Sequence, residues 1–210
     1  MDQYQTIKVQ AEARVDINRS HFIAISFPLS ESSDPEQLII HAKKRYPEAT
    51  HYVYAYTYGR HQAVQKFSDD GEPSGTGGLP ILELLKHRNL ENTLVVVIRY
   101  YGGIKLGTGG LKRAYSKAAQ EALNKANIIT LTASRILHLV CPYPFWGKMQ
   151  YELENRKIQV DGIIYEEDVT LTVAVPLDQV KAFIEWIHGL TASQAVIEER
   201  HLEYRQITND

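Results

Sequence analysis

The segment that most constrains the fold is TLVVVIRYY at residues 93–101, the most apolar run of the chain. Its Val and Ile residues follow one another without the polar alternation of a strand that has one face in water. Such a run is typical of a central strand that is buried on both sides of its sheet. We therefore expect a sheet with a covering layer on each face.

The segments around this strand can supply those layers. Strict alternation in THYVYAYTY, residues 50–58, predicts a strand whose four tyrosines share one face, with His51 on the other. Asp34 and Pro35 predict the start of a helix that ends near Tyr46, before Pro47. The other elements expected in this half are strands at 4–17, 20–28 and 62–67, and helices at 79–87 and 111–127.

The second half shows a different order of elements. Its patterns predict strands at 133–141, 158–165, 168–176 and 193–204, and helices at 144–157 and 178–188. The order β-α-β-β-α-β is the ferredoxin-like pattern, in which two crossovers place both helices on one face of a four-stranded sheet. The fold class predicted for the whole chain is therefore α+β, with a domain boundary near residues 127–134.

Composition excludes several classes of protein. Hydrophobic residues make up 44% and charged residues 23%, which is ordinary globular usage and excludes a disordered chain or a coiled coil. No apolar run has the length needed to cross a bilayer, so no membrane partner is expected. Cys141 is the single cysteine, which excludes a disulfide framework, predicts a reducing cytoplasmic location and suggests a small buried side chain.

Charge is distributed unevenly along the chain. Residues 1–134 hold 16 Lys and Arg against 13 Asp and Glu, whereas residues 135–210 hold 7 against 12. Within residues 99–125 there are six basic side chains and one acidic side chain, Glu121. A polyanion should be drawn to this stretch. The acidic second half is better suited to a protein partner.

The segment RYYGGIKLGTGGLKRAY, residues 99–115, is the first candidate site. A buried strand leads into a glycine-rich turn, and the turn opens a basic helix. Glycines let backbone N–H groups approach an anion, and a helix start adds unpaired donors. Thr108 stands where a phosphate-binding Walker loop has Lys, and the spacing does not match a dinucleotide fingerprint. The glycines can therefore form an anion or RNA site, or they can only make a tight turn.

The loop SDDGEPSGTGG, residues 68–78, is the second candidate. Asp69, Asp70 and Glu72 could hold a hard cation such as Mg²⁺, although the spacing is not that of an EF-hand. The same carboxylates could instead accept hydrogen bonds from backbone N–H groups, including those that open the next helix. A catalytic or partner contact, or pairing with the basic segment, also stays open.

Aromatic side chains accompany both segments. Tyr100 and Tyr101 precede the glycines and could stack unpaired bases, or they could simply pack on the sheet. The tyrosines of residues 52–58 fit the second interpretation better. No nucleophile with a base and an orienting group emerges, which argues against a hydrolase, and no cofactor or metal site is expected.

Two of these motifs together resemble a known family. FSDDGEPSGTGGLPIL followed by VVVIRYYGGIKLGTGGLKRAY resembles the signature of the Impact family. Residues 1–130 resemble its Impact domain, and residues 135–205 resemble the small C-terminal domain of bacterial members. The family-motif positions are Asp69, Asp70, Gly71, Glu72, Pro73, Gly75, Arg99, Tyr100, Tyr101, Gly102, Gly103, Gly107, Gly109 and Gly110.

The resemblance implies a fold and a class of partner. The first domain should have the fold of ribosomal protein S5 domain 2, with a mixed sheet and a left-handed crossover. The two folds in this order resemble domains IV and V of elongation factor G, which favours RNA or the translation machinery as partner. The function expected is a non-catalytic, translation-associated regulator. The alternative is a nucleotide- or phosphorylated-metabolite-binding protein or enzyme that uses the same loop with an acidic Mg²⁺ site.

The site predicted to bind nucleic acid or another anion combines the strand end, the turn and the basic helix face. Its residues are Arg99, Tyr100, Tyr101, Gly102, Gly103, Lys105, Gly107, Gly109, Gly110, Lys112, Arg113 and Lys117. The acidic second domain is expected to contact a protein partner, if it has one. The sequence does not indicate an oligomeric state.

Overall fold

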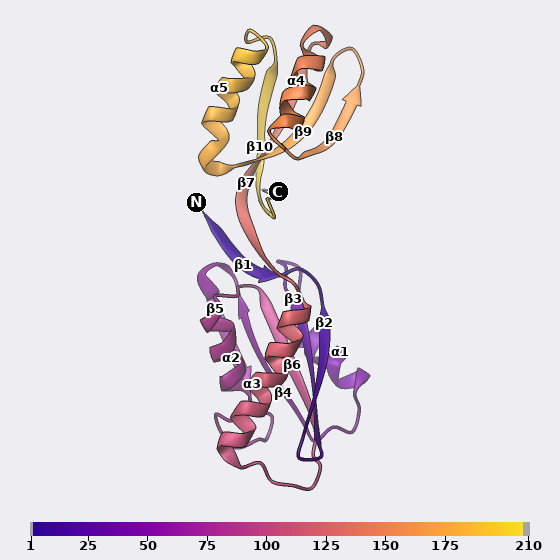
Figure 1. Ribbon diagram of the computed structural model, residues 1–210, viewed down its shortest axis with the longest axis vertical. Helices are drawn as coiled ribbons and strands as arrows, with labels where there is room; N and C mark the ends of the chain where they lie inside the picture. Colours follow the sequence, from indigo (N-terminus) through magenta and orange to yellow (C-terminus); the bar gives the residue numbers. More distant parts are fainter. Residues whose placement is uncertain (1, 208–210) are drawn as a thin grey trace. The chain divides into compact units, whose positions relative to one another are not determined.

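The computed structural model describes residues 2–207 (Figure 1). Its contacts divide the chain into two compact units, one of residues 4–129 and one of residues 130–207 with residues 2 and 3. The elements up to the end of the first unit are β1 (Gln3–Ile7), β2 (Ala11–Ile17), β3 (Ser20–Pro28), α1 (Pro35–Arg45), β4 (His51–Tyr58), the 3₁₀ turn η1 (Arg60–Gln62), β5 (Val64–Ser68), α2 (Gly78–His87), β6 (Thr93–Tyr100) and α3 (Gly107–Lys125).

The sheet of the first unit has the strand order β2-β3-β6-β4-β5, and each neighbouring pair is antiparallel. Strand β6 lies in the middle, as its apolar sequence predicts. Val95 and Val97 point into one core, and Leu94, Val96 and Ile98 point into the other. The expectation of a mixed sheet is wrong. Strands β3 and β4 are parallel to one another, but β6 lies between them, so they form no parallel ladder.

Helices cover both faces of this sheet. Helices α2 and α3 lie on one face, and α1 lies on the other (Figure 1). The tyrosines of β4 face α1, whereas Val53 and Ala55 face α2 and α3, as the alternation predicts. The buried side of α3 carries small residues, which bring the helix close to β2 and β3. These fully buried alanines are Ala114, Ala118, Ala119 and Ala122.

Two boundaries in this unit differ from the sequence prediction. The strand expected at 4–17 is interrupted at residues 8–10, because the N–H groups of Lys8 and Val9 donate to the Ala126 carbonyl and complete the C-terminal end of α3. Helix α3 begins at Gly107 rather than at residue 111. Gly107, Gly109 and Gly110 are therefore residues of the first turn of α3 and do not belong to the preceding loop.

The second unit follows the predicted β-α-β-β-α-β order. Its elements are β7 (Ile128–Cys141), α4 (Tyr143–Asn155), β8 (Val160–Tyr165), β9 (Val169–Pro176), the 3₁₀ turn η2 (Leu177–Gln179), α5 (Val180–Leu190) and β10 (Val196–Arg205). Strands pair in the order β10-β7-β9-β8, all antiparallel, which is the ferredoxin-like arrangement. Residue 2 extends this sheet, because the Ala133 N–H donates to the Asp2 carbonyl.

The core of the second unit lies between its sheet and its two helices. Leu137, Leu139 and Cys141 of β7 point into it and meet Met149 of α4 and Ile187 of α5. Cys141 is fully buried, as predicted, and burial raises the pKa of its thiol. Within residues 2–207, none of the helices has the length and apolar character that a membrane crossing requires.

Candidate functional site: a pocket at the start of helix α3

The acidic loop between β5 and α2 is held by its first carboxylate. Asp69 Oδ1 accepts hydrogen bonds from the N–H groups of Gly77 and Gly78, each at 2.9 Å, and Oδ2 accepts from Gly75 at 2.8 Å. These donors include the first N–H groups of α2, which has no other side-chain cap. A Cβ on Gly78 would lie 2.7 Å from the Ser68 carbonyl oxygen. Asp69 and these glycines therefore shape the loop.

The second carboxylate of the loop fastens it to β4. Asp70 Oδ2 accepts from the Tyr52 N–H at 2.7 Å, and its backbone carbonyl accepts from His51 Nδ1 at 2.8 Å. Lys43 of α1 lies 3.8 Å from Oδ1 of the same residue. Asp70 has a positive φ of 45°, which these bonds hold in place.

The third carboxylate, Glu72, lies in the interior and its side chain is only 3% exposed. Its Oε1 accepts hydrogen bonds from Arg99 Nη1 at 2.6 Å and from the Tyr115 hydroxyl at 2.7 Å. His51 Nε2 lies 3.9 Å from the same oxygen. Burial, and then the bond to Glu72, raise the pKa of Tyr115. Glu72 and Arg99 therefore pair the acidic loop with the segment 99–115, which is one of the alternatives left open by the sequence.

Arg99 is buried at the end of β6, with a side chain that is 6% exposed. Its guanidinium lies 5.3 Å from the ring centres of both Phe22 and Tyr101, and its Nε has no hydrogen-bond partner among residues 2–207. We expected Arg99 to engage a phosphate from solvent, but the structure commits its charge to Glu72. The guanidinium therefore holds the site together from within.

These contacts decide between the interpretations of the acidic loop. Each of its three carboxylates accepts hydrogen bonds from the protein itself, which is the capping interpretation. Among residues 2–207, no group of three or more His, Cys, Asp or Glu is arranged to hold a metal ion.

The glycine-rich turn after β6 has a packed beginning and an open end. A Cβ on Gly102 would lie 2.1 Å from the Arg19 carbonyl carbon, and its N–H donates to Ser20 Oγ at 3.1 Å. Gly103 and Gly107 instead have open space around them and positive φ angles of 82° and 68°. Gly102 is therefore required for close packing, whereas the later glycines allow the turn to enter the helix.

Helix α3 starts without a cap. Leu106 occupies the N-cap position, and no side chain of the described residues accepts from the first N–H groups of the helix. Nineteen residues of helix, Gly107–Lys125, place a partial positive charge at this end. A pocket of about 350 Å³ opens there. Its lining residues are Glu72, Pro73, Arg99, Tyr101, Lys105, Leu106, Gly107, Thr108 and Leu111.

The outer face of α3 is basic. Lys112, Arg113 and Lys117 are exposed and line an open hollow with Glu83 of α2. Within residues 2–207, these three cations and Lys105 form no ion pair or hydrogen bond. A Cβ on Gly109 would lie 3.6 Å from Arg113 Nη1, so this guanidinium lies over the first turn of α3.

The two tyrosines at the end of β6 have different surroundings. The Tyr100 hydroxyl donates to the Pro47 carbonyl at 2.9 Å, its ring packs against the core beside α1, and burial raises its pKa. Tyr101 is 44% exposed and lines the pocket. Of this pair, only Tyr101 offers a ring to a ligand. The tyrosines of β4 pack on the sheet, as the plainer interpretation predicts.

Several residues of this pocket were not predicted from the sequence. Leu106, Thr108 and Leu111 line it because α3 begins one turn earlier than predicted. Tyr115 lies on the buried side of α3, and its hydrogen bond to Glu72 was not predicted. A hydroxyl among the alanines of that side is the available signal, since a buried hydroxyl needs a hydrogen-bond partner.

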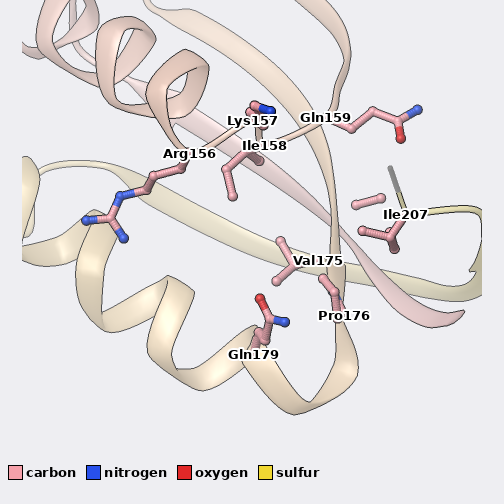
Figure 2. A pocket seen from close by; sticks show the side chains of 9 residues that line it. Arg156, Lys157, Ile158, Gln159, Val175, Pro176, Gln179 and Ile207 are labelled. Atoms are coloured by element: carbon pink, nitrogen blue, oxygen red, sulfur yellow. The ribbon is translucent and has the colours of Figure 1, made fainter. Parts of the chain in front are cut away.

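A second pocket, of about 180 Å³, lies in the ferredoxin-like unit (Figure 2). Figure 2 shows Arg156 directed away from Ile158 and Val175. Its guanidinium lies 4.3 Å from the Trp186 ring centre and 3.6 Å from Glu152, so its charge is already engaged. The pocket at α3 is therefore the stronger candidate, because charged and aromatic groups from three segments meet there.

The fold defines a class of protein: an α+β chain in which an S5 domain 2-like domain precedes a ferredoxin-like domain. Residues 18–123 match the Impact N-terminal domain, and residues 139–194 match a domain of unknown function (DUF1949). The chain belongs to the Impact family, which confirms the resemblance carried by its two motifs.

Individual relatives agree with this assignment. IMPACT family member YvyE of Bacillus subtilis (strain 168) is 40% identical over 201 residues, which cover 96% of this chain and 93% of YvyE. IMPACT family member YigZ of Escherichia coli (strain K12) is 33% identical over 170 residues, 80% of this chain and 83% of YigZ. A crystal structure described as a hypothetical protein has a TM-score of 0.61 at 27% identity and covers 100% of both chains.

Proposed function

We propose that this protein binds single-stranded RNA, free or in the ribosome, through the start and the basic face of α3, as a non-catalytic regulator in translation. The observation that carries the proposal is the set of four cations without ion-pair partners beside an uncapped helix start. The residues proposed to contact RNA are Tyr101, Lys105, Lys112, Arg113 and Lys117, with the backbone of Gly107, Gly109 and Gly110.

The geometry of α3 suits a phosphate backbone. Residues 105–117 span roughly 15 to 18 Å along the helix. A single strand that runs along this length brings several consecutive phosphates within reach of the basic face. The helix start adds N–H donors and a partial positive charge at one end of the row. Three or four phosphate contacts are therefore a reasonable expectation.

The open sheet face of the second unit supports assigning RNA to the first unit. Register places Val140 and His138 of β7 on the face opposite α4 and α5, beside Thr170 and Thr172 of β9 and Glu198 of β10. Apart from the imidazole of His138, these rows carry no aromatic ring, and they carry no Lys or Arg. Base stacking on a sheet needs such rings, and phosphates need such charges.

A salt titration tests the proposal. Binding of labelled single-stranded RNA, followed by fluorescence anisotropy, should weaken with salt at a log–log slope of about −2 to −3. The double variant Lys112→Ala/Arg113→Ala should lower the magnitude of that slope by about 1.4. The matched control is Lys8→Ala/Lys44→Ala, which removes two exposed cations that also lack ion pairs. No binding at low salt, or equal slopes for both doubles, would contradict the proposal.

The ribosome can be tested separately, together with the protein contact proposed for the acidic second unit. Ile164 and Val196 are exposed at the two ends of one row of the open sheet face, 57% and 63% respectively. We expect the wild-type chain to co-sediment with purified ribosomes at low salt. Ile164→Asp/Val196→Asp should weaken co-sedimentation without changing RNA affinity if this face docks on a ribosomal protein. Unchanged co-sedimentation would exclude that contact.

A further inference from the structure

The pocket at the start of α3 contains a fixed hydrogen-bond acceptor. The Glu72 side chain is 3% exposed and lines the pocket. Oε1 is occupied by Arg99 and Tyr115, whereas within residues 2–207 Oε2 accepts no hydrogen bond. Arg99, Tyr115 and the nearby His51 contact Oε1 and hold the carboxylate in one orientation. Oε2 is not one of the buried atoms that lack a partner, so it is accessible at the pocket wall and can accept from a ligand that brings a hydroxyl or amine donor.

The other side of the same pocket favours an anion. Lys105, Leu106, Gly107 and Thr108 line it, and the first N–H groups of α3 are uncapped there. Lys105 forms no ion pair within the described chain. A phosphate at this point would meet backbone donors, the helix dipole and one full positive charge.

A third feature is the ring of Tyr101. It is 44% exposed, and the buried Arg99 guanidinium lies 5.3 Å from its centre. The ring therefore has support from the interior and remains accessible to a flat ligand. Bases stack on such rings whatever their sequence.

We propose that this pocket binds a ribonucleotide with a free ribose cis-diol. Glu72 Oε2 accepts from the ribose hydroxyls, the start of α3 and Lys105 hold the phosphate, and Tyr101 stacks the base. An acidic side chain that accepts from ribose hydroxyls is a recurrent arrangement in nucleotide sites. The volume of about 350 Å³ lies at the lower end of small-ligand pockets, which suits one nucleotide.

The cis-diol gives the pocket a direction on RNA. Only the 3′-terminal nucleotide of an RNA strand has both hydroxyls free. For RNA, this assignment rests on the proposed function. The strand would lie along α3 with its 3′ end in the pocket. A free nucleoside 5′-monophosphate carries the same chemistry and is the other source of this ligand.

The direct test is calorimetric titration of the full chain with AMP and with 2′,3′-dideoxyAMP. AMP should bind, and the dideoxy compound should bind about tenfold or more weakly, because Glu72 loses its donors. Lys105→Ala and Tyr101→Ala should each weaken AMP by about tenfold, whereas Tyr101→Phe keeps the stacking ring. Lys44→Ala is the matched control and should leave affinity unchanged. These exposed positions avoid the unfolding that a change at Glu72 could cause.

The test with RNA compares the affinities of two oligonucleotides of the same sequence, one with a free 3′-terminal cis-diol and one with a 3′-phosphate. Tighter binding of the diol form, lost in Tyr101→Ala, supports recognition of the terminus. Equal binding of both forms, together with no AMP binding at millimolar concentration, overturns the pocket while α3 remains an RNA site. Diol-dependent AMP binding without any RNA binding keeps the pocket for free nucleotides and overturns the proposed function. AMP and dideoxyAMP binding equally would also overturn the inference.

Discussion

The acidic loop at residues 68–78 and the glycine-rich turn at residues 102–110 line the same pocket, yet they satisfy their polar groups in opposite ways. In the loop, Asp69 and Asp70 accept from backbone N–H groups of the protein itself. In the turn, the helix start is uncapped and Lys105 has no ion pair among the described residues. Glycine content does not distinguish a structural loop from a binding loop; the partners of the polar groups do. Changes at Asp69 and Asp70 should therefore lower stability, whereas a change at Lys105 should lower binding.

The largest effect is expected at the buried ion pair. Arg99→Met leaves the Glu72 carboxylate buried without its cation and should lower the free energy of unfolding by about 3–5 kcal/mol. Urea denaturation measures this, with Lys105→Ala as the control, which should stay within about 0.5 kcal/mol. The double change Glu72→Gln/Arg99→Met should cost less than the sum of the single changes. If Arg99→Met lowers the free energy of unfolding by less than about 1 kcal/mol, the buried ion pair does not stabilise the acidic loop as proposed.

The next effect separates two glycines within the turn. Gly102→Ala forces a Cβ to 2.1 Å from the Arg19 carbonyl carbon, so backbone has to shift, at a cost of about 3 kcal/mol. Gly103→Ala meets no atom but keeps a positive φ of 82°, which should cost about 1 kcal/mol. Thermal unfolding of the two variants measures the difference. Equal losses would mean that Gly102 is not required for packing.

A smaller effect is expected at the loop carboxylate that caps α2. Asp69→Ala removes the acceptor for three N–H groups and should lower stability by about 2 kcal/mol. Asp34→Ala is the comparison, since Asp34 caps α1 at an exposed site and should cost about 1 kcal/mol. Asp69→Ala should leave RNA affinity unchanged once the variant is folded. A loss of RNA affinity in the folded variant would assign the acidic loop to binding.

The smallest effect is a change in pH dependence. Tyr115 has a raised pKa in the folded chain because it is buried and bonded to Glu72. The stability that this proton contributes is complete below about pH 10 and falls as pH rises above the unfolded pKa, by up to about 1.4 kcal/mol per pH unit. Tyr115→Phe should cost about 1 kcal/mol at neutral pH and flatten this decline. Denaturation at pH 9 to 11 measures the slopes, and parallel slopes would contradict the assignment.

The sequence predicted the layers of the fold more reliably than the ends of its elements. The continuous apolar run at 93–101 and the alternation at 50–58 reflect which faces of the sheet are buried, and the structure confirms both predictions. The interruption at residues 8–10 could not be predicted, because the N–H groups of Lys8 and Val9 bond to the distant end of α3. The early start of α3 also escaped prediction, since glycines have low helix propensity and gave no helix signal.

The candidate site was predicted in part. Lys105 in the turn and Lys112, Arg113 and Lys117 on α3 are exposed cations, as expected for a basic segment. Arg99 looked equivalent to them in the sequence, but it is buried against Glu72, 27 residues away. No local pattern distinguishes these two kinds of basic residue, because the difference lies in a partner from another loop.

The order of apolar and polar residues by itself determined that a central strand would be covered on both faces and that α3 would have one small buried side and one basic side. Those outcomes follow from local periodicity, which water and burial act on directly. Only the tertiary structure decided which polar groups have no partner among the described residues: Glu72 Oε2, Lys105 and the first N–H groups of α3. Hydrogen bonds and ion pairs depend on atoms a few ångströms apart, and the distance between such atoms is set by the folded chain rather than by their order along it.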